Sequence, residues 1–206
     1  MTRRRDRRHW RRRQGDDPYL ARARAEGWRS RSVYKLIEIQ RRERLLRPGA
    51  TVIDLGAAPG GWSQYAASLV GDKGRVLAVD LLPVDGLAGV DRIQGDFGDE
   101  SVLEAVENWL GDGPADLVMS DMAPNITGIR AVDQPRAMLL AELAAELALK
   151  TLRPGGAFVC KLFHGEGFDE YLRALRPEFE RLRVRKPAAS RPESRETYLV
   201  ATARKL

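Results

Sequence analysis

A glycine-rich segment, Gly56 to Gly61, is the first part of the sequence whose residue types suit ligand binding. Its spacing is G-x-x-x-G-G, which differs from the G-x-G-x-x-G loop that binds the pyrophosphate of a dinucleotide. It also lacks the Gly-Lys-Ser/Thr ending of loops that hold a nucleoside triphosphate. A glycine loop without a lysine for phosphate therefore favours a ligand that carries no phosphate group.

Three aspartates, Asp80, Asp96 and Asp121, each stand at the end of a short apolar run that is typical of a buried strand. Any one of them could simply cap the helix that follows. As a set beside the glycine loop they favour a ligand site, since a carboxylate after the second strand can accept hydrogen bonds from both hydroxyls of a ribose. The ligand described in this way is S-adenosylmethionine, which we predict as the cofactor.

Lys161 lies inside the apolar run 157–163, where an unpaired ammonium group would be costly to bury. The chain has 6 Lys and 29 Arg, so the lysines at this position and at Lys35 are unusual choices of cation. Arginine cannot be deprotonated in a protein. Lys161 is therefore a candidate for a group that takes up a proton, whereas Lys35 taken alone could equally be a solvated helix residue.

The elements that would position these residues alternate between two patterns. Strand-like apolar runs occur at 51–55, 75–80, 92–96, 116–121 and 157–163, and helical spacing occurs at 31–46, 62–70, 100–110, 134–151 and 168–175. This alternation predicts an α/β fold with a parallel sheet covered on both faces. The segments 179–186 and 197–203 have no helix between them and predict a closing antiparallel hairpin.

The composition excludes several classes of protein. A chain of 206 residues with 43% hydrophobic residues has the size and composition of one globular domain. Cys160 is the only cysteine and there are two histidines, so an internal disulfide and a Cys/His zinc site are excluded, and we predict no metal. No apolar run approaches the ~20 residues that cross a bilayer, and the N-terminus lacks the apolar stretch of a signal peptide. We therefore expect a cytoplasmic protein without membrane contact.

The positive charge is concentrated at the N-terminus. Residues 1–31 contain twelve Arg and four acidic residues, whereas residues 32–206 carry a net charge of −2. A segment so rich in arginine cannot form a core and could serve only to keep the protein in solution. Eight Arg within the first thirteen residues, with Trp10 able to stack on a base, favour RNA binding instead. We predict a basic arm, 1–31, followed by one catalytic domain, 32–206.

Five sequence segments together resemble the FtsJ-like family of ribosomal RNA 2′-O-ribose methyltransferases, from about Glu26 to the C-terminus. They are SRSVYKL, DLGAAPGGWSQYA, SDMAPN, VCKLF and SRETYLV. The resemblance implies a Rossmann-like methyltransferase fold whose mostly parallel sheet ends in an antiparallel hairpin. It also implies that the substrate is a uridine 2′-hydroxyl in 23S rRNA, methylated on the large ribosomal subunit.

The resemblance further assigns roles to individual residues. The family's cofactor-binding positions fall on Gly60, Trp62, Asp80, Asp96 and Asp121. Its catalytic Lys-Asp-Lys-Glu tetrad falls on Lys35, Asp121, Lys161 and Glu196. From side-chain size alone, Trp62 could equally be a core residue, and Glu196 could be a charge at the edge of a strand.

The tetrad suits methyl transfer to a hydroxyl group. The enzyme must hold oxygen, methyl carbon and sulfur in line, and must remove one proton. We assign Lys161 as the base, Lys35 and Glu196 as groups that hold the ribose and the lysine, and Asp121 as the link between cofactor and tetrad. A second ammonium group nearby favours the neutral form of a lysine, whereas the carboxylates oppose it and serve for orientation.

Other functions remain open from the sequence. The same fold could methylate tRNA or another RNA, or could serve as a non-catalytic RNA-binding factor in ribosome assembly. Methylation of a flipped base is disfavoured, because Asp121 is followed by Met-Ala-Pro-Asn rather than by the Pro-Pro-Tyr/Phe of base methyltransferases. We expect the protein to act as a monomer.

Overall fold

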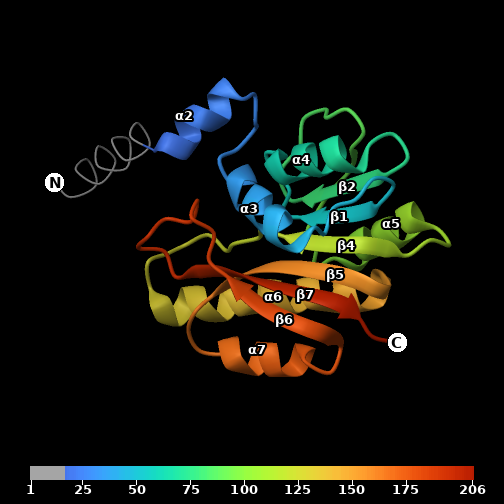
Figure 1. Ribbon diagram of the computed structural model, residues 1–206. Coiled ribbons are helices and arrows are strands. Elements are labelled where there is room, and N and C mark those ends of the chain that lie inside the picture. The colour runs from blue at the N-terminus through green and yellow to red at the C-terminus, as the bar shows by residue number, and fades with distance from the viewer. Residues whose placement is uncertain (1–16) are drawn as a thin grey trace.

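A single seven-stranded sheet organises the computed structural model, which describes residues 17–206 (Figure 1). The strand order is β3-β2-β1-β4-β5-β7-β6. The strands are β1 (Thr51–Leu55), β2 (Arg75–Asp80), β3 (Asp91–Gln94), β4 (Ala115–Ser120), β5 (Leu152–Phe163), β6 (Phe179–Arg185) and β7 (Glu196–Arg204). The first five strands are parallel, and β7 runs antiparallel to both β5 and β6. The predicted α/β sheet with a closing antiparallel hairpin is confirmed.

Helices cover both faces of this sheet, as can be followed in Figure 1. They are α2 (Pro18–Ala25), α3 (Val33–Glu43), α4 (Gly61–Val70), α5 (Glu100–Leu110), α6 (Arg130–Thr151) and α7 (Phe168–Leu175). Helices α3 and α4 pack in one apolar core, and α5, α6 and α7 pack in another on the opposite face. Because the sheet is buried on both faces, its central strands carry apolar residues on both faces: in β1, Val52 faces the first core and Ile53 the second.

Helix α3 is shorter than the predicted 31–46 because its C-terminal end is closed locally. Arg44 follows the helix in the left-handed conformation, with φ 52°, which ends regular helix geometry. The Gln40 side chain then binds both the N–H and the C=O of Leu46, at 2.8 Å each. Leu45 and Leu46 are thereby held against the core without being helical.

Other predicted boundaries differ too, most of all that of β5, which begins at Leu152 rather than at 157. Strand β3 ends at Gln94, just before the N–H of Gly95 donates to the carbonyl of Asp80 at 3.0 Å, so Asp96 lies in the turn beyond the strand. Helix α6 begins at Arg130 rather than 134, with Pro135 inside it. The Asp133 carboxylate accepts from the backbone N–H groups of Thr127 and Gly128, and so fixes the preceding turn to the new helix start.

Helix α2 lies in the segment that was predicted as a basic arm. Asp17 caps it by accepting from the N–H groups of Tyr19 and Leu20. Its Ala23 is 1% exposed and packs with Val33 of α3. The arginine-rich residues 1–13 lie outside the described residues. Among the helices of 17–206, none is both long enough and apolar enough to cross a bilayer.

Candidate active site

The glycine loop that follows β1 requires glycine at its tightest points. Gly60 has φ 105° and precedes α4, and a Cβ atom there would lie 2.8 Å from Leu87 Cδ1. A Cβ on Gly61 would collide with the Ser30 hydroxyl. Backbone therefore packs closely against neighbouring segments here, and the loop brings the N-terminus of α4 to the carboxyl edge of the sheet. This is the edge at which sheets of this type bind ligands.

Arg29 braces this loop from outside. Its guanidinium donates to the carbonyls of Pro59 at 3.3 Å, Asp85 at 2.9 Å and Gly86 at 2.8 Å. These carbonyls belong to the glycine loop and to the loop after β2, so the side chain ties two segments that are far apart in sequence. Nothing in the sequence marked Arg29 among the many arginines near it.

The three strand-end aspartates do not cap helices. Asp80 accepts from the N–H groups of Ala58 at 2.9 Å and Leu82 at 2.8 Å, which joins the end of β2 to the glycine loop. Asp96 is exposed and accepts only from Gly98 N–H, at 2.9 Å, among the described residues; α5 has Asp99 at its N-cap. No helix begins directly after Asp80 or Asp121. The capping interpretation is wrong at all three positions.

S-adenosylmethionine fits this set of groups. The loop offers closely packed backbone at Gly60, and carboxylates at Asp80 and Asp96 that keep acceptor capacity for hydroxyl or amino groups. Arg29, whose side chain lies against Gly60, has its guanidinium bound to carbonyls, so this arginine does not offer a free cation to a phosphate group. The strand order places Gly60, Asp80, Asp96 and Asp121 after neighbouring strands, along one edge.

Trp62 is placed differently from the other predicted cofactor residues. Its side chain is 2% exposed, and its indole N–H donates to the carbonyl of Ser32 at 2.9 Å. The ring lies 5.7 Å from that of Tyr198, in the core between α3, α4 and the sheet. The indole is thus a core group beneath the tetrad, and its predicted contact with the cofactor stays a prediction.

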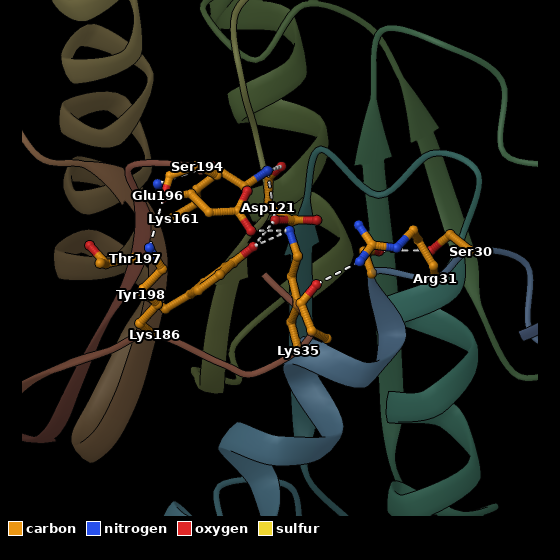
Figure 2. A network of polar contacts seen from close by, with 12 residues as sticks. Ser30, Arg31, Lys35, Asp121, Lys161, Lys186, Ser194, Glu196, Thr197 and Tyr198 are labelled. Atoms are coloured by element: carbon orange, nitrogen blue, oxygen red, sulfur yellow. Dashed lines mark hydrogen bonds and ion pairs between the residues drawn. The ribbon is translucent and has the colours of Figure 1, made fainter. Parts of the chain in front are cut away.

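The four predicted catalytic residues form one polar network (Figure 2). Lys35 comes from α3 and pairs with Glu196 of β7, with 2.6 Å between Nζ and Oε1. Lys161 of β5 pairs with Asp121, with 2.7 Å between Nζ and Oδ1, and also donates to the Asp121 carbonyl at 2.8 Å. Residues separated by more than 150 positions are therefore brought into two adjacent ion pairs at the carboxyl edge of the sheet.

Tyr198 connects the two ion pairs and was missed by the sequence analysis. Its hydroxyl donates to Asp121 Oδ1 at 2.6 Å and accepts from Lys35 Nζ at 3.1 Å. It stands opposite Lys161 in the register of β5 and β7. The sequence did contain a signal for Tyr198. Because side chains alternate along a strand, Tyr198 lies on the same face of β7 as Glu196, two residues earlier.

Burial and charge act in opposite directions on the acidic groups. Burial alone would raise the pKa of Asp121, but the charges of Lys161 and Lys35 outweigh it and lower that pKa. The pKa of Glu196 is lowered in the same way, against its burial, chiefly by Lys35. Burial, together with the charges of Asp121 and Glu196, raises the pKa of Tyr198 well above its ordinary value. At neutral pH the network therefore contains two carboxylates and a neutral phenol.

Asp54 is a further buried acid, located in β1 beneath the glycine loop. It is fully buried, with Ser63 donating to Oδ2 at 2.5 Å and no partner for Oδ1 among the described residues. Burial raises the pKa of Asp54 to about 8, and the nearby charges of Asp121 and Asp80 add to this. Because the Asp54 carboxyl is largely neutral at pH 7, it can be buried beneath the glycine loop without a paired cation.

Comparisons with known proteins agree with this geometry. A family model described as FtsJ-like methyltransferase matches residues 28–204. The Ribosomal RNA large subunit methyltransferase E of Pseudomonas aeruginosa is 52% identical over 201 residues, which cover 98% of this chain and 97% of that protein. A Plasmodium falciparum protein described as a ribosomal RNA methyltransferase is 25% identical in its crystal structure, with a TM-score of 0.78 over 86% of this chain and 98% of that chain.

A more distant structure shares the fold. Fibrillarin of Aeropyrum pernix, solved with S-adenosyl-L-methionine bound, is 16% identical, with a TM-score of 0.58 over 83% of this chain and 76% of that chain. The sheet order, the glycine loop and the strand-end carboxylates define an S-adenosylmethionine-dependent methyltransferase. Within that class, this chain belongs to the FtsJ-like methyltransferase family. The predicted family, cofactor and type of enzyme are confirmed.

Proposed function

We propose that this protein transfers a methyl group from S-adenosylmethionine to the ribose 2′-hydroxyl of a uridine in 23S rRNA, on the large ribosomal subunit. The observation that carries the proposal is the buried network of Lys35, Asp121, Lys161 and Glu196 beside the glycine loop. The 52% identity to a large-subunit rRNA methyltransferase over nearly the whole chain supports the choice of RNA.

The cofactor, when bound, supplies an electrophilic methyl group on a sulfonium. The residues of the chain must then place the 2′-oxygen in line with that methyl group and accept the hydroxyl proton. Asp121 fixes the Lys161 side chain by two contacts, which directs Nζ to one position. Glu196 and Tyr198 fix Lys35 in the same way, so that its ammonium group can hold the ribose. In this proposal the Lys161 ammonium group first releases one proton to solvent, and the neutral Nζ then accepts the proton of the 2′-hydroxyl.

The partners of the enzyme follow from the same proposal. The substrate is RNA, the arginine-rich arm 1–31 binds phosphates, and residues 32–206 form the catalytic domain. We further propose that the enzyme acts as a monomer in the cytoplasm, where ribosomal subunits mature. The packing of Ala23 and Arg31 against the domain supports an arm that is anchored beside the active site, since Arg31 donates to the carbonyl of Ala189 at 2.7 Å.

Methyl transfer to defined RNAs tests the function. Labelled S-adenosylmethionine is supplied with large ribosomal subunits from a strain that lacks this gene, with protein-free 23S rRNA, and with tRNA. We expect the label on a uridine ribose of 23S rRNA, with subunits as the better substrate. Label on tRNA would contradict 23S rRNA as the substrate and identify tRNA instead. Binding to subunits without any methyl transfer would favour a non-catalytic assembly factor.

Asp80→Ala is expected to raise the dissociation constant for S-adenosylmethionine by one to two orders of magnitude. This corresponds to the loss of about 1.5–3 kcal/mol, the range for a hydrogen bond to a charged group. Calorimetry of cofactor binding measures the effect, and thermal unfolding without cofactor checks that the loop contact to Ala58 is not required for folding. Asp85→Ala, at an exposed position of the same loop, is the matched control. Unchanged affinity in Asp80→Ala would show that Asp80 serves only to hold the loop.

A further inference from the structure

A groove of about 660 Å³ lies at the edge of the sheet opposite the active site. It is formed where β1, β4 and β5 begin, where α3 ends, and where β6 begins and β7 ends. Arginine dominates its lining, with side chains from Arg42, Arg44, Arg47, Arg153, Arg181 and Arg183. Small-molecule pockets are mostly apolar, so this lining points to an extended anion instead.

Internal ion pairs neutralise only part of this charge. Asp116 pairs with Arg153 at 2.7 Å, and Glu43 pairs with Arg183 at 2.8 Å. Arg42 pairs with Glu38 at 3.2 Å. The remaining arginines of the groove, Arg44, Arg47 and Arg181, are exposed and form no ion pair with any carboxylate of residues 17–206. Three guanidinium groups are thus available to a partner, against one further acid, Glu180.

The backbone of the groove is also unusual. Within residues 17–206, Arg44 and Ala203 are the two residues other than glycine that have a positive φ, at 52° and 58°. Both line the groove. Such conformations cost free energy and tend to occur at functional sites, where surrounding structure maintains them. At Arg44 the left-handed conformation presents the side chain at the end of α3, where a regular helix would have continued.

The groove is linked to the active site by one helix. Helix α3 contributes Lys35 to the tetrad and reaches the groove at Arg44, nine residues later, which is about 14 Å at the rise of an α-helix. That distance corresponds to roughly four nucleotide steps of a helical strand. An RNA strand that has its target ribose at Lys161 must span at least this distance to reach the groove.

We propose that this groove binds the phosphodiester backbone of the substrate RNA, at nucleotides distant from the methylated ribose. Guanidinium groups bind phosphate in a bidentate manner and are the usual choice for this contact. Arg44, Arg47 and Arg181 supply the contacts, and the groove sets how the RNA is oriented against the domain. The identity of the anion as substrate RNA rests on the proposed function, whereas binding of RNA by the groove does not.

The experiment compares a triple variant, Arg44→Gln, Arg47→Gln and Arg181→Gln, with the unmodified protein. RNA affinity is measured by fluorescence anisotropy between 50 and 300 mM salt, with protein-free 23S rRNA and with large subunits. Each lost phosphate contact lowers the slope of log affinity against log salt by about 0.7–0.9. We expect the slope to fall by about 2, and the affinity at 0.1 M salt to fall on the order of 100-fold. Cofactor affinity should be unchanged.

A control variant distinguishes the loss of phosphate contacts in the groove from a general loss of positive charge. Arg173→Gln with Arg176→Gln removes two exposed arginines, one in α7 and one at its C-cap, that do not line the groove, and should leave the slope nearly unchanged. The double variant Arg47→Gln, Arg181→Gln avoids the strained position 44 and should show most of the effect if the triple variant folds poorly. An equal loss in the α7 control, or no loss in the groove variants, would overturn the proposal.

Two further outcomes identify the partner. A loss seen with subunits but not with protein-free rRNA would show that the groove contacts an acidic ribosomal protein, and would overturn the phosphate assignment. If the unmodified protein methylates neither RNA, the proposed function fails. The salt dependence of RNA binding still tests the groove in that case, because it requires no methyl transfer.

Discussion

Replacement of Lys161 by alanine is expected to lower the single-turnover rate of methyl transfer by at least the ~10²–10⁴ that a general base contributes. Cofactor affinity should remain, because Lys161 contacts Asp121 and not the glycine loop. The fold should survive with reduced stability, because Asp121 loses one partner of a buried ion pair but keeps the hydrogen bond from Tyr198. The rate is measured with saturating cofactor and RNA.

Lys161→Arg distinguishes proton transfer from charge placement. Arginine keeps the positive charge but cannot accept a proton at working pH. If Lys161 is the base, the arginine variant should be nearly as inactive as the alanine variant. Substantial activity in Lys161→Arg would contradict the base assignment and leave Lys161 as a group that positions the 2′-oxygen. Lys150→Ala, on the exposed side of α6, is the matched control and should retain full activity.

Much of the fold follows from the sequence because the sheet is buried on both faces. The central strands are short, mostly apolar runs and several are followed by a helix with clear spacing, so β1, β2 and α5 begin and end where predicted. The predicted helix boundaries differ from the structure where side-chain hydrogen bonds, rather than the period of the apolar residues, set the end of a helix. Gln40 closes α3 and Asp133 fixes the start of α6, and both act through hydrogen bonds to backbone that no local pattern reveals.

For a similar reason, the sequence predicted some residues of the active site and not others. The tetrad was found because its residues stand in recognisable segments, and the structure brings all four together. Tyr198 and Arg29 were missed because their roles depend on the register of β5 against β7 and on the docking of a distant loop. The protonation state of Asp54 could not be predicted from the sequence either, because its burial depends on how the helices cover both faces of the sheet.

Asp121→Asn is expected to destabilise the folded protein strongly. Asparagine has nearly the same shape, but it removes the charge that pairs with Lys161 and that accepts from Tyr198. Breaking a buried pair by removing one partner costs about 3–5 kcal/mol, because the other charge is left without compensation. Urea unfolding at pH 7 without cofactor measures the loss of stability. Glu107→Gln, which breaks the exposed pair with Lys150, should cost no more than about 1 kcal/mol.

The effect of Asp121→Asn should also depend on pH in a definite direction. The pKa of Asp121 is lowered in the folded protein, so its stabilising contribution is complete above the pKa of an unfolded aspartate, about 3.9, and is lost as the pH falls through the lower folded value. The gap in unfolding free energy between the two proteins should therefore be constant from pH 7 to about pH 5 and should narrow below about pH 4. A gap that instead grew on acidification would mean that Asp121 is protonated in the folded protein, and would contradict its role as the anion that holds Lys161.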